Sequence, residues 1–293
     1  MKIVFIGAVK FSEKALQKLI SMRDQVVGVC TLETSSFNSD HVDLTQVACA
    51  AAIPVRYTPD INSQETFNWI AALKPDIIFC FGWSRLIKKP LLDLAPLGVV
   101  GYHPALLPSN RGRHPLIWAI VLGLRETGST FFFMDESADT GEIFSQRVLS
   151  IQKEDDAASL YSKMTKTALS QLAEFLPLLE SGRFARRSQA TGCGNKWRKR
   201  NRKDGQIDWR MSAMSIHNLV RGLTRPYVGA HFILAEQEIK IWKTEVIEHN
   251  QANIEPGKVL ASDSQGVIVK TNEGAIRLIE IEPAVNISAG DYL

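Results

Sequence analysis

The sequence lacks the short motifs of several large enzyme classes. It contains no GxxxxGK[ST] phosphate loop, no GxGxxG dinucleotide motif, no HExxH zinc motif and no GxSxG nucleophile elbow. These absences remove support for ATP hydrolysis, ordinary dinucleotide redox chemistry, zincin proteolysis and serine hydrolysis. The six histidines are scattered, and only His103 and His114 lie near each other, so the sequence predicts no metal site.

Cysteines and long apolar runs are also scarce. The 293 residues include four cysteines and no CxxC pair, and three of the four stand in apolar stretches. We therefore expect reduced, buried thiols. No apolar run approaches the ~20 residues of a transmembrane helix, and the start MKIVFIGAVKF is too short and too soon charged for a signal peptide. The expected location is cytoplasmic, with no membrane partner.

Positive charge is concentrated in one segment. Nine basic residues and no acidic residue lie between Arg183 and Lys203, which leaves 25 basic against 31 acidic residues elsewhere in the chain. A protein that holds nucleic acid along its length is expected to be basic over a wider surface.

The first hundred residues alternate short buried strands with helices, which is typical of a doubly wound, mostly parallel sheet. The expected strands are Lys2–Gly7, Val26–Thr31, Ile53–Tyr57, Asp76–Phe81 and Gly98–Tyr102, and the expected helices are Ser12–Met22, Leu44–Ala51 and Gln64–Leu73. Ligands of such sheets bind at the loops beyond the carboxyl ends of the strands. These loops are Gly7–Phe11, Leu32–Asp43, Phe81–Lys89 and the segment after Tyr102.

The rest of the chain predicts a second, smaller domain. A long amphipathic helix, Asp156–Leu179, ends at Ser181 and Gly182, and its apolar stripe is expected in the core. After the basic segment, one short helix is followed by several strands, which is typical of a small β-rich domain. The expected organisation is an α/β domain over 1–182, a basic linker over 183–203 and a β-rich domain over 204–293. Phe131–Met134 is expected to be a buried strand.

One histidine and one aspartate stand where chemistry is expected. His103 follows a buried strand at the start of a proline-rich loop, and Asp139 precedes a glycine 36 residues later. A carboxylate beside an imidazole can help it to move a proton near neutral pH, as an amine requires when it becomes an amide. The same spacing also fits a structural loop histidine and a turn aspartate.

The motifs in this region resemble those of the folate-dependent formyltransferase family, which includes methionyl-tRNA formyltransferase and the nucleotide-sugar N-formyltransferases. They are His103-Pro-Ala-Leu-Leu-Pro, Arg111-Gly-Arg, Glu126-Thr-Gly-Ser-Thr and Asp139-Thr-Gly. Similarity continues in Asp204-Gly-Gln-Ile-Asp-Trp, Asn218-Leu-Val-Arg and Pro226-Tyr-Val-Gly-Ala, which resemble the start of the family's C-terminal domain. The resemblance covers nearly the whole chain.

The resemblance implies a Rossmann-like N-terminal domain and a formyl transfer from 10-formyltetrahydrofolate to a primary amine. By this analogy His103 is the acid/base residue and Asp139 is its partner. The carried-over folate contacts are Trp83, Leu86, Ile87 and Asp135, and the expected acceptor contacts are Asn110, Arg111, Arg113 and His114. Arg113 could equally pair with a surface carboxylate.

The sequence departs from the family pattern at Gly101. The family has Asn-x-His, whose amide polarises the formyl oxygen, whereas Gly101 stands two residues before His103. Losing one such donor typically costs ~10²- to 10³-fold in rate. The alternatives are a rearranged site, with Asn110 as one substitute donor, an engineered substitution, or an impaired homologue that only binds folate or a sugar nucleotide.

The acceptor is expected to be a nucleotide-linked amino sugar, with methionyl-tRNA as the alternative. The loop Leu32–Asp43 is acidic and polar where the tRNA branch carries a basic loop, and it would repel phosphates. Arg111-Gly-Arg113 resembles the sugar branch, which implies a role in lipopolysaccharide or glycan biosynthesis and a homodimer.

The basic run Lys196–Lys203 allows three interpretations. It is a solvated linker, a clamp for a sugar nucleotide's diphosphate, or an RNA patch in which Trp197 stacks on a base.

Overall fold

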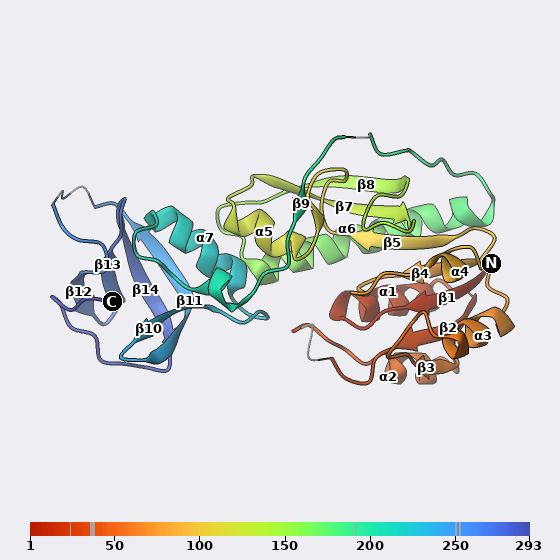
Figure 1. Cartoon of the computed structure of the whole chain (residues 1–293), viewed down its shortest axis with the longest axis horizontal. Helices are drawn as coiled ribbons and strands as arrows, with labels where there is room; N and C mark the ends of the chain where they lie inside the picture. Colours follow the sequence, from red (N-terminus) through yellow and green to blue (C-terminus); the bar gives the residue numbers. More distant parts are fainter. Residues whose placement is uncertain (24, 36–38, 191, 250, 252) are drawn as a thin grey trace. The chain divides into compact units, whose positions relative to one another are not determined.

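The computed structural model describes residues 1–23, 25–35, 39–190, 192–249, 251 and 253–293. The chain forms two compact units (Figure 1). The first comprises Met1–Pro115, Thr127–Leu149 and Ser162–Trp197, and the second comprises Leu116–Glu126, Ser150–Tyr161 and Arg198–Leu293. Most of the basic segment that we expected as a linker, up to Trp197, thus groups with the first unit. The boundaries 1–182, 183–203 and 204–293 stay predictions.

The first unit is built on a seven-stranded sheet in the order β3-β2-β1-β4-β5-β7-β8. Its strands are β1 (Lys2–Ile6), β2 (Gln25–Thr31), β3 (Val55–Tyr57), β4 (Ile77–Cys80), β5 (Val99–His103), β7 (Glu126–Phe133) and β8 (Ile143–Ser150). The first five pair in parallel, and β7 pairs antiparallel to β5. The predicted mostly parallel sheet and all five of its expected strands are therefore confirmed, with ends shifted by one or two residues.

The chain up to residue 182 forms six α-helices in its described residues. They are α1 (Lys10–Ser21), α2 (Thr45–Ala50), α3 (Gln64–Ala72), α4 (Lys89–Leu92), α5 (Pro115–Val121) and α6 (Ala157–Glu180). Of these, α1, α2, α3 and α6 were predicted, and α4 and α5 were not. The stripe of α6 is buried, as predicted, from Leu160 to Leu179. Phe175 of α6 packs edge-on against Phe79 and Phe131, so the run Phe131–Met134 does belong to a buried strand.

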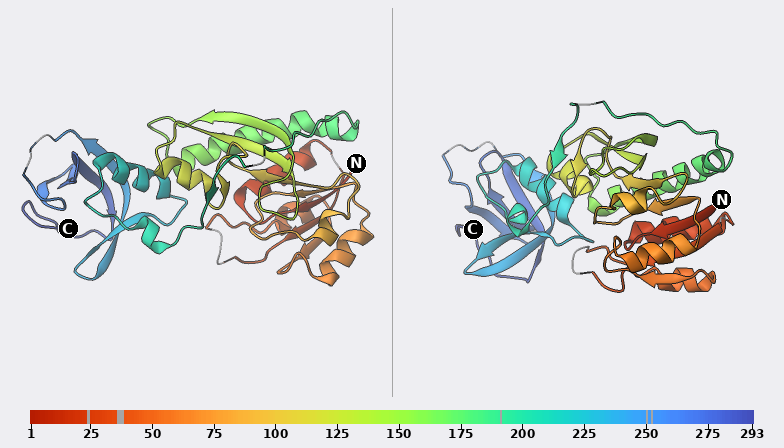
Figure 2. Two further views of the ribbon diagram at one scale, coloured as in Figure 1. Left: turned by 45° about the horizontal axis from the view of Figure 1, so that its top comes forward. Right: turned by 45° about the vertical axis from the view of Figure 1, so that its right-hand side comes forward.

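The C-terminal unit is a small, mostly antiparallel β domain, also as predicted. Its sheet has the order β10-β11-β14-β13-β12, and helix α7 lies across it (Figure 2). These elements are β10 (Ala230–Leu234), β11 (Gln237–Ile247), β12 (Val259–Asp263), β13 (Gly266–Lys270), β14 (Ala275–Glu282), α7 (Ala213–Leu223) and the short 3-10 helix η1 (Arg202–Gly205). Ser212 caps α7 by accepting a hydrogen bond from the Ser215 backbone.

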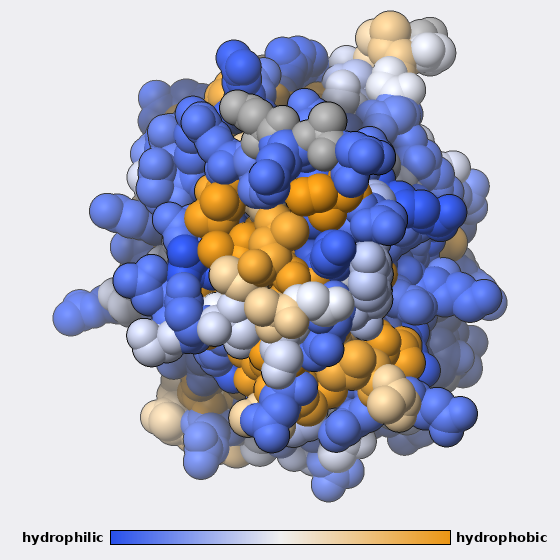
Figure 3. All heavy atoms as spheres, turned by 90° about the vertical axis from the view of Figure 1, so that its left-hand side faces the viewer, coloured by the Kyte–Doolittle hydropathy of each residue, from blue (hydrophilic) through white to orange (hydrophobic). Residues whose placement is uncertain are grey.

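One hollow of about 530 Å³ opens on the C-terminal unit, and none of the residues predicted for the active site lines it. Its walls include Met214, Ile247 and Lys270. Figure 3 shows apolar side chains gathered on this end of the molecule. Among the described residues, no helix is both long and apolar enough to span a membrane.

The four cysteines are all free thiols, but only two of them are buried as predicted. Cys30 and Cys80 are buried, and burial raises the pKa of the Cys30 thiol to about 12. Cys49 and Cys193 are exposed, so our expectation of buried thiols is wrong for them. Cys49 stands near the end of the short helix α2, whose buried face includes Ala48 instead.

The buried His231 and the half-buried His217 predict how the stability of the protein depends on pH. Burial is the main cause that lowers the pKa of His217 and of His231 from about 6.5, and it outweighs the attraction of Glu238 for His231. The unfolded chain therefore binds protons that the folded chain does not, and stability should fall as pH drops below about 6.5. The expected slope is at most ~1.4 kcal/mol per group and pH unit.

Denaturant unfolding at pH 7.5 and pH 5.5 checks this expectation. The loss of unfolding free energy between the two pH values should be smaller in the variant carrying His217→Gln and His231→Gln. An equal loss in both proteins would assign the pH dependence to other groups.

Candidate active site

His103 ends β5 and is held by the loop that follows it. Its side chain is 6% exposed, and its Nε2 lies 2.8 Å from the carbonyl oxygen of Asn110. A carbonyl oxygen only accepts hydrogen bonds, so Nε2 carries the hydrogen in this contact. In the neutral ring Nδ1 is then unprotonated and able to take a proton.

Asp139 stands opposite Nδ1 of this ring. One carboxylate oxygen, Oδ2, accepts a hydrogen bond of 2.9 Å from the backbone of Gly112, and the other, Oδ1, lies 3.6 Å from His103 Nδ1. The side chain of Asp139 is 20% exposed. The structure thus brings together the imidazole and the carboxylate that the sequence singled out, across 36 residues of chain.

The loop after His103 carries the expected acceptor residues. Asn110 binds His103 through its carbonyl and Asn195 Oδ1 through its N–H, at 2.7 Å. Arg111 donates from Nε to the carbonyl oxygen of Asp139 at 3.1 Å. Both residues therefore touch the His103–Asp139 pair directly.

Arg113 and His114 are both half-buried on the same loop. The backbone of Arg113 donates to the Trp197 carbonyl at 3.0 Å. His114 has a positive φ of 55°, which turns the chain into α5. Their roles toward an acceptor stay predictions.

The place of the missing family amide is filled by apolar side chains. A Cβ on Gly101 would lie 2.9 Å from Met134 Cγ and 3.0 Å from the ring of Phe132. Phe132 is opposite Gly101 in the β5–β7 ladder and is buried. The apolar side chains packed around Gly101 therefore leave little space for an asparagine side chain at this position.

The four residues expected to contact folate differ in their exposure and in their hydrogen bonds. Leu86 is 56% exposed, and Trp83 is half-buried with its Nε1 buried and unpartnered among the described atoms. A buried donor without an acceptor beside an exposed apolar side chain fits a flat heteroaromatic ring such as a pterin. Asp135 accepts from the Ser137 backbone and from Thr140 Oγ1 within its own turn.

The side chain of Ile87 lies in the core, which agrees with the resemblance, since it implies that the backbone of Phe81–Ile87 lines the folate pocket. Ile87 is 2% exposed in the core cluster around Ile78 and Leu91, so any contact with folate must come from its backbone. On either side of it, the Asn62 side chain binds Leu86 O and Lys88 N at 2.9 and 2.7 Å. Asn62 escaped the sequence analysis, because nothing in its surroundings marks it as a partner of this loop.

The basic run is mostly exposed but makes specific contacts within the protein, and its interpretation as a solvated linker stays a prediction. Lys196 and Trp197 form the strand β9, which pairs with β6 (Arg111–Gly112). In the second unit, Arg198 pairs with Asp204 and Arg202 with Glu238. Arg200 is 8% exposed and lies over the ring of Trp118.

These ion pairs keep the acidic partners ionised. Hydrogen bonds from Arg198 hold the pKa of Asp204 at about 2, and those from Lys240 and Arg202 do the same for Glu238. Two of the six basic residues of the run, Arg198 and Arg202, are thus paired with carboxylates inside the C-terminal unit.

The loop after β2 is described except for residues 36–38. His41 binds the carbonyl oxygens of Ala8 and Glu33, which fixes the loop beside the end of β1. Burial alone would raise the pKa of Asp43, but hydrogen bonds from Thr45 and Tyr57 lower it. The carboxylate stays negative, as the sequence analysis assumed for this loop.

No group of histidine, cysteine and acidic side chains suited to a metal ion occurs within the described ranges.

Comparisons with known proteins cover almost the whole chain. Residues 1–176 match the model of a formyl transferase, and residues 199–290 match that of a formyl transferase C-terminal domain. The methionyl-tRNA formyltransferase of Geotalea daltonii is 32% identical over 301 residues, which cover 100% of this chain and 95% of the relative.

Two solved structures share the fold at lower identity. An N-formyltransferase from Helicobacter canadensis, in complex with folinic acid and dTDP-3-aminofucose, superimposes with a TM-score of 0.72 at 18% identity and covers 95% of this chain and 99% of its own. HypX from Aquifex aeolicus, in complex with tetrahydrofolic acid, gives a TM-score of 0.69 at 21% identity over 96% of this chain and 44% of its own.

Proposed function

This chain belongs to the formyl transferase family, and from that premise we propose that it transfers a formyl group from 10-formyltetrahydrofolate to the primary amine of a nucleotide-linked amino sugar. The observation that supports this reaction is the buried His103 ring, whose Nε2 contacts the Asn110 carbonyl and whose Nδ1 faces Asp139 Oδ1. A reaction that turns an amine into an amide must remove one proton, and this pair is suited to accept it.

In the proposed mechanism the two ring nitrogens of His103 have different roles. Bound folate would supply the formyl group: the bond between its nitrogen and the formyl carbon would break, and that nitrogen would leave as an amine with the proton that His103 had taken from the acceptor. As the acceptor amine forms its bond to the formyl carbon, Nδ1 of His103 takes the amine proton, while Nε2–H stays bonded to the Asn110 carbonyl. The resulting imidazolium then has an acceptor at each N–H, Asn110 O at 2.8 Å and Asp139 Oδ1 at 3.6 Å. A looser contact in the absence of substrate is common at acid/base sites.

The surroundings of the proposed folate site contribute orientation and exclude water. Trp83 and Leu86 would offer the apolar wall, and the buried Nε1–H of Trp83 has no acceptor among the described atoms. Asp135 holds the turn that leads to Asp139.

The balance of charge supports a sugar nucleotide as acceptor. Binding of a transfer RNA requires cations that can replace counterions along the phosphate backbone. Within the part of the chain that the structure describes, Arg198 and Arg202 are paired with carboxylates and Arg200 is buried. The ionised Asp43 beside β2 adds negative charge to the loop that carries the basic residues of the tRNA branch.

Methionyl-tRNA is the second candidate acceptor. The relative from Geotalea daltonii that matches this chain over its full length at 32% identity is a methionyl-tRNA formyltransferase. An impaired binding homologue is the third candidate, because Gly101 lacks the family amide.

Mass spectrometry of acceptors incubated with the protein and 10-formyltetrahydrofolate tests the proposal. Nucleotide-linked 3-amino and 4-amino sugars should each be compared with methionyl-tRNA for the gain of one formyl group. Formylation of a sugar nucleotide is the expected result. Formylation of the tRNA alone would replace the proposed acceptor, and folate binding without any transfer would favour the binding homologue.

A further inference from the structure

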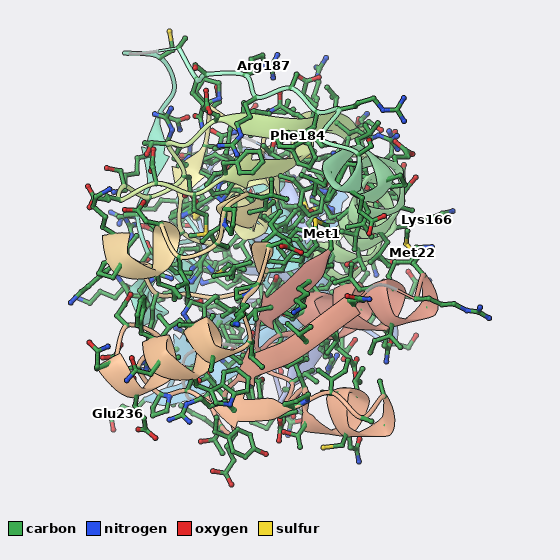
Figure 4. The ribbon with its side chains drawn as sticks, turned by 90° about the vertical axis from the view of Figure 1, so that its right-hand side faces the viewer. Met1, Met22, Lys166, Phe184, Arg187 and Glu236 are labelled. Atoms are coloured by element: carbon green, nitrogen blue, oxygen red, sulfur yellow. The ribbon has the colours of Figure 1, made fainter. Side chains whose placement is uncertain are left out.

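The segment after α6 returns to the active site instead of leaving it. Phe184 packs against Phe133 and Phe144, and Arg187 exchanges two backbone hydrogen bonds of 2.8 Å with Ile143 (Phe184 and Arg187 are labelled in Figure 4). The segment continues to β9, which pairs with β6 of the loop behind His103. We call the described residues 183–190 and 192–197 the strap.

One side chain of the strap reaches the catalytic pair. Gln189 donates from Nε2 to the carbonyl oxygens of Asp139 and Gly141, at 2.9 and 2.8 Å. Its Oε1 accepts from Arg111 Nη2 at 2.6 Å and from Arg111 Nε at 3.2 Å. The half-buried amide of Gln189 therefore bonds through its nitrogen to the loop of Asp139 and through its oxygen to Arg111 on the loop after His103.

These contacts hold a strained piece of backbone. Asp139 has a φ of 61°, in the left-handed region that a residue with a side chain rarely adopts. Arg111 and Gln189 both donate to the Asp139 carbonyl, so the conformation is fixed from outside the turn. The same turn directs the Asp139 carboxylate toward Gly112 N and His103 Nδ1.

We infer that Gln189 is a positioning residue for the reaction: it fixes the Asp139 carboxylate against His103 by clamping the Asp139 turn to Arg111. The inference rests on the proposed role of the His103–Asp139 pair. It assigns a function in the active site to a residue outside every motif on which the family resemblance rests.

Two substitutions of Gln189 and one control at Ser188 test these contacts. Gln189→Met keeps the length of the side chain and removes all its hydrogen bonds. Gln189→Glu keeps an acceptor for Arg111 but turns a carboxylate oxygen toward two carbonyl oxygens. Ser188→Ala is the matched control, since Ser188 is the neighbouring strap residue and its hydroxyl bonds to Glu142 at the surface.

The kinetic result expected for Gln189→Met and Gln189→Glu is a fall in kcat of ~10- to 100-fold, because small displacements of a catalytic group have effects of this size. KM for the formyl donor should change by less than about threefold, and Ser188→Ala should keep the wild-type kcat. Wild-type kcat in Gln189→Glu would overturn the inference, because this variant has lost both bonds to the carbonyls.

A double-mutant cycle distinguishes positioning from a general structural role. If Gln189 acts through Asp139, Gln189→Met should cost less than about threefold in kcat when Asp139→Asn is already present. An undiminished loss in that background would show that Gln189 acts elsewhere.

Hydrogen exchange of the Gly112 amide, measured by NMR on the full chain, needs no turnover. This N–H is bonded to Asp139 Oδ2, so it should exchange at least about tenfold faster in Gln189→Met and at the wild-type rate in Ser188→Ala. Unchanged exchange in Gln189→Met would overturn the clamp. If the wild-type protein formylates no acceptor, the proposed function fails, and this exchange measurement still decides on the clamp.

Discussion

Replacing His103 by glutamine should lower kcat by ~10²- to 10⁴-fold, the range that general acid–base groups contribute. A glutamine amide can still donate to the Asn110 carbonyl, as Nε2 does at 2.8 Å, but it cannot take a proton as Nδ1 does. The loss should therefore appear in kcat, with the unfolding free energy close to that of the wild-type protein.

Steady-state kinetics with the acceptor that the wild-type protein uses checks this expectation. His249→Gln is a matched control, because His249 lines the hollow of the C-terminal unit and not the proposed site. A kcat within about threefold of wild type in His103→Gln would remove His103 from the chemistry and leave it as a structural loop histidine.

Restoring the family amide by Gly101→Asn should damage the protein rather than activate it. The new Cβ would be only 2.9 Å from Met134 Cγ and 3.0 Å from the buried Phe132 ring. Overpacking of this kind typically costs ~1 to 3 kcal/mol of stability. We expect no gain in kcat, because the amide could enter only by displacing these side chains.

Two further variants separate the effect of the added Cβ from that of the amide: Gly101→Ala, and Gly101→Asn combined with Met134→Ala. The alanine variant adds the same Cβ without an amide, so it should share most of the stability loss. The double variant opens space and should recover part of it. A tenfold rise in kcat in Gly101→Asn alone, at unchanged stability, would show that the native site lacks a donor that the apolar packing does not exclude.

The first five strands of the sheet could be predicted from the sequence because they are short apolar runs between turns, whereas β8, whose side chains are mostly not buried, was not predicted. The apolar stripe of α6 could also be predicted, because its helical spacing continues from Leu160 to Leu179. The two-residue strands β6 and β9 escaped prediction, because two residues carry no periodicity.

The candidate site could be predicted only in its directly reacting residues. His103 and Asp139 are marked by their residue types and by the motifs around them. The contacts of Gln189 and Asn195 could not be predicted, because they join backbone groups about 50 and 85 residues away in the sequence. The packing around Gly101 depends in the same way on side chains of β7 and the turn after it.

Part of the contact between the strap and the rest of the first unit runs through the main chain. Arg187 bonds to Ile143 on both backbone atoms, and the carbonyls of Asn195 and Trp197 accept from Arg111 and Arg113. Main-chain contacts are indifferent to most substitutions but depend on the number of residues between them. The side chains at these three positions can therefore change with little effect on these bonds, whereas an insertion or deletion between them would shift the segment that carries Gln189 and uncouple the site.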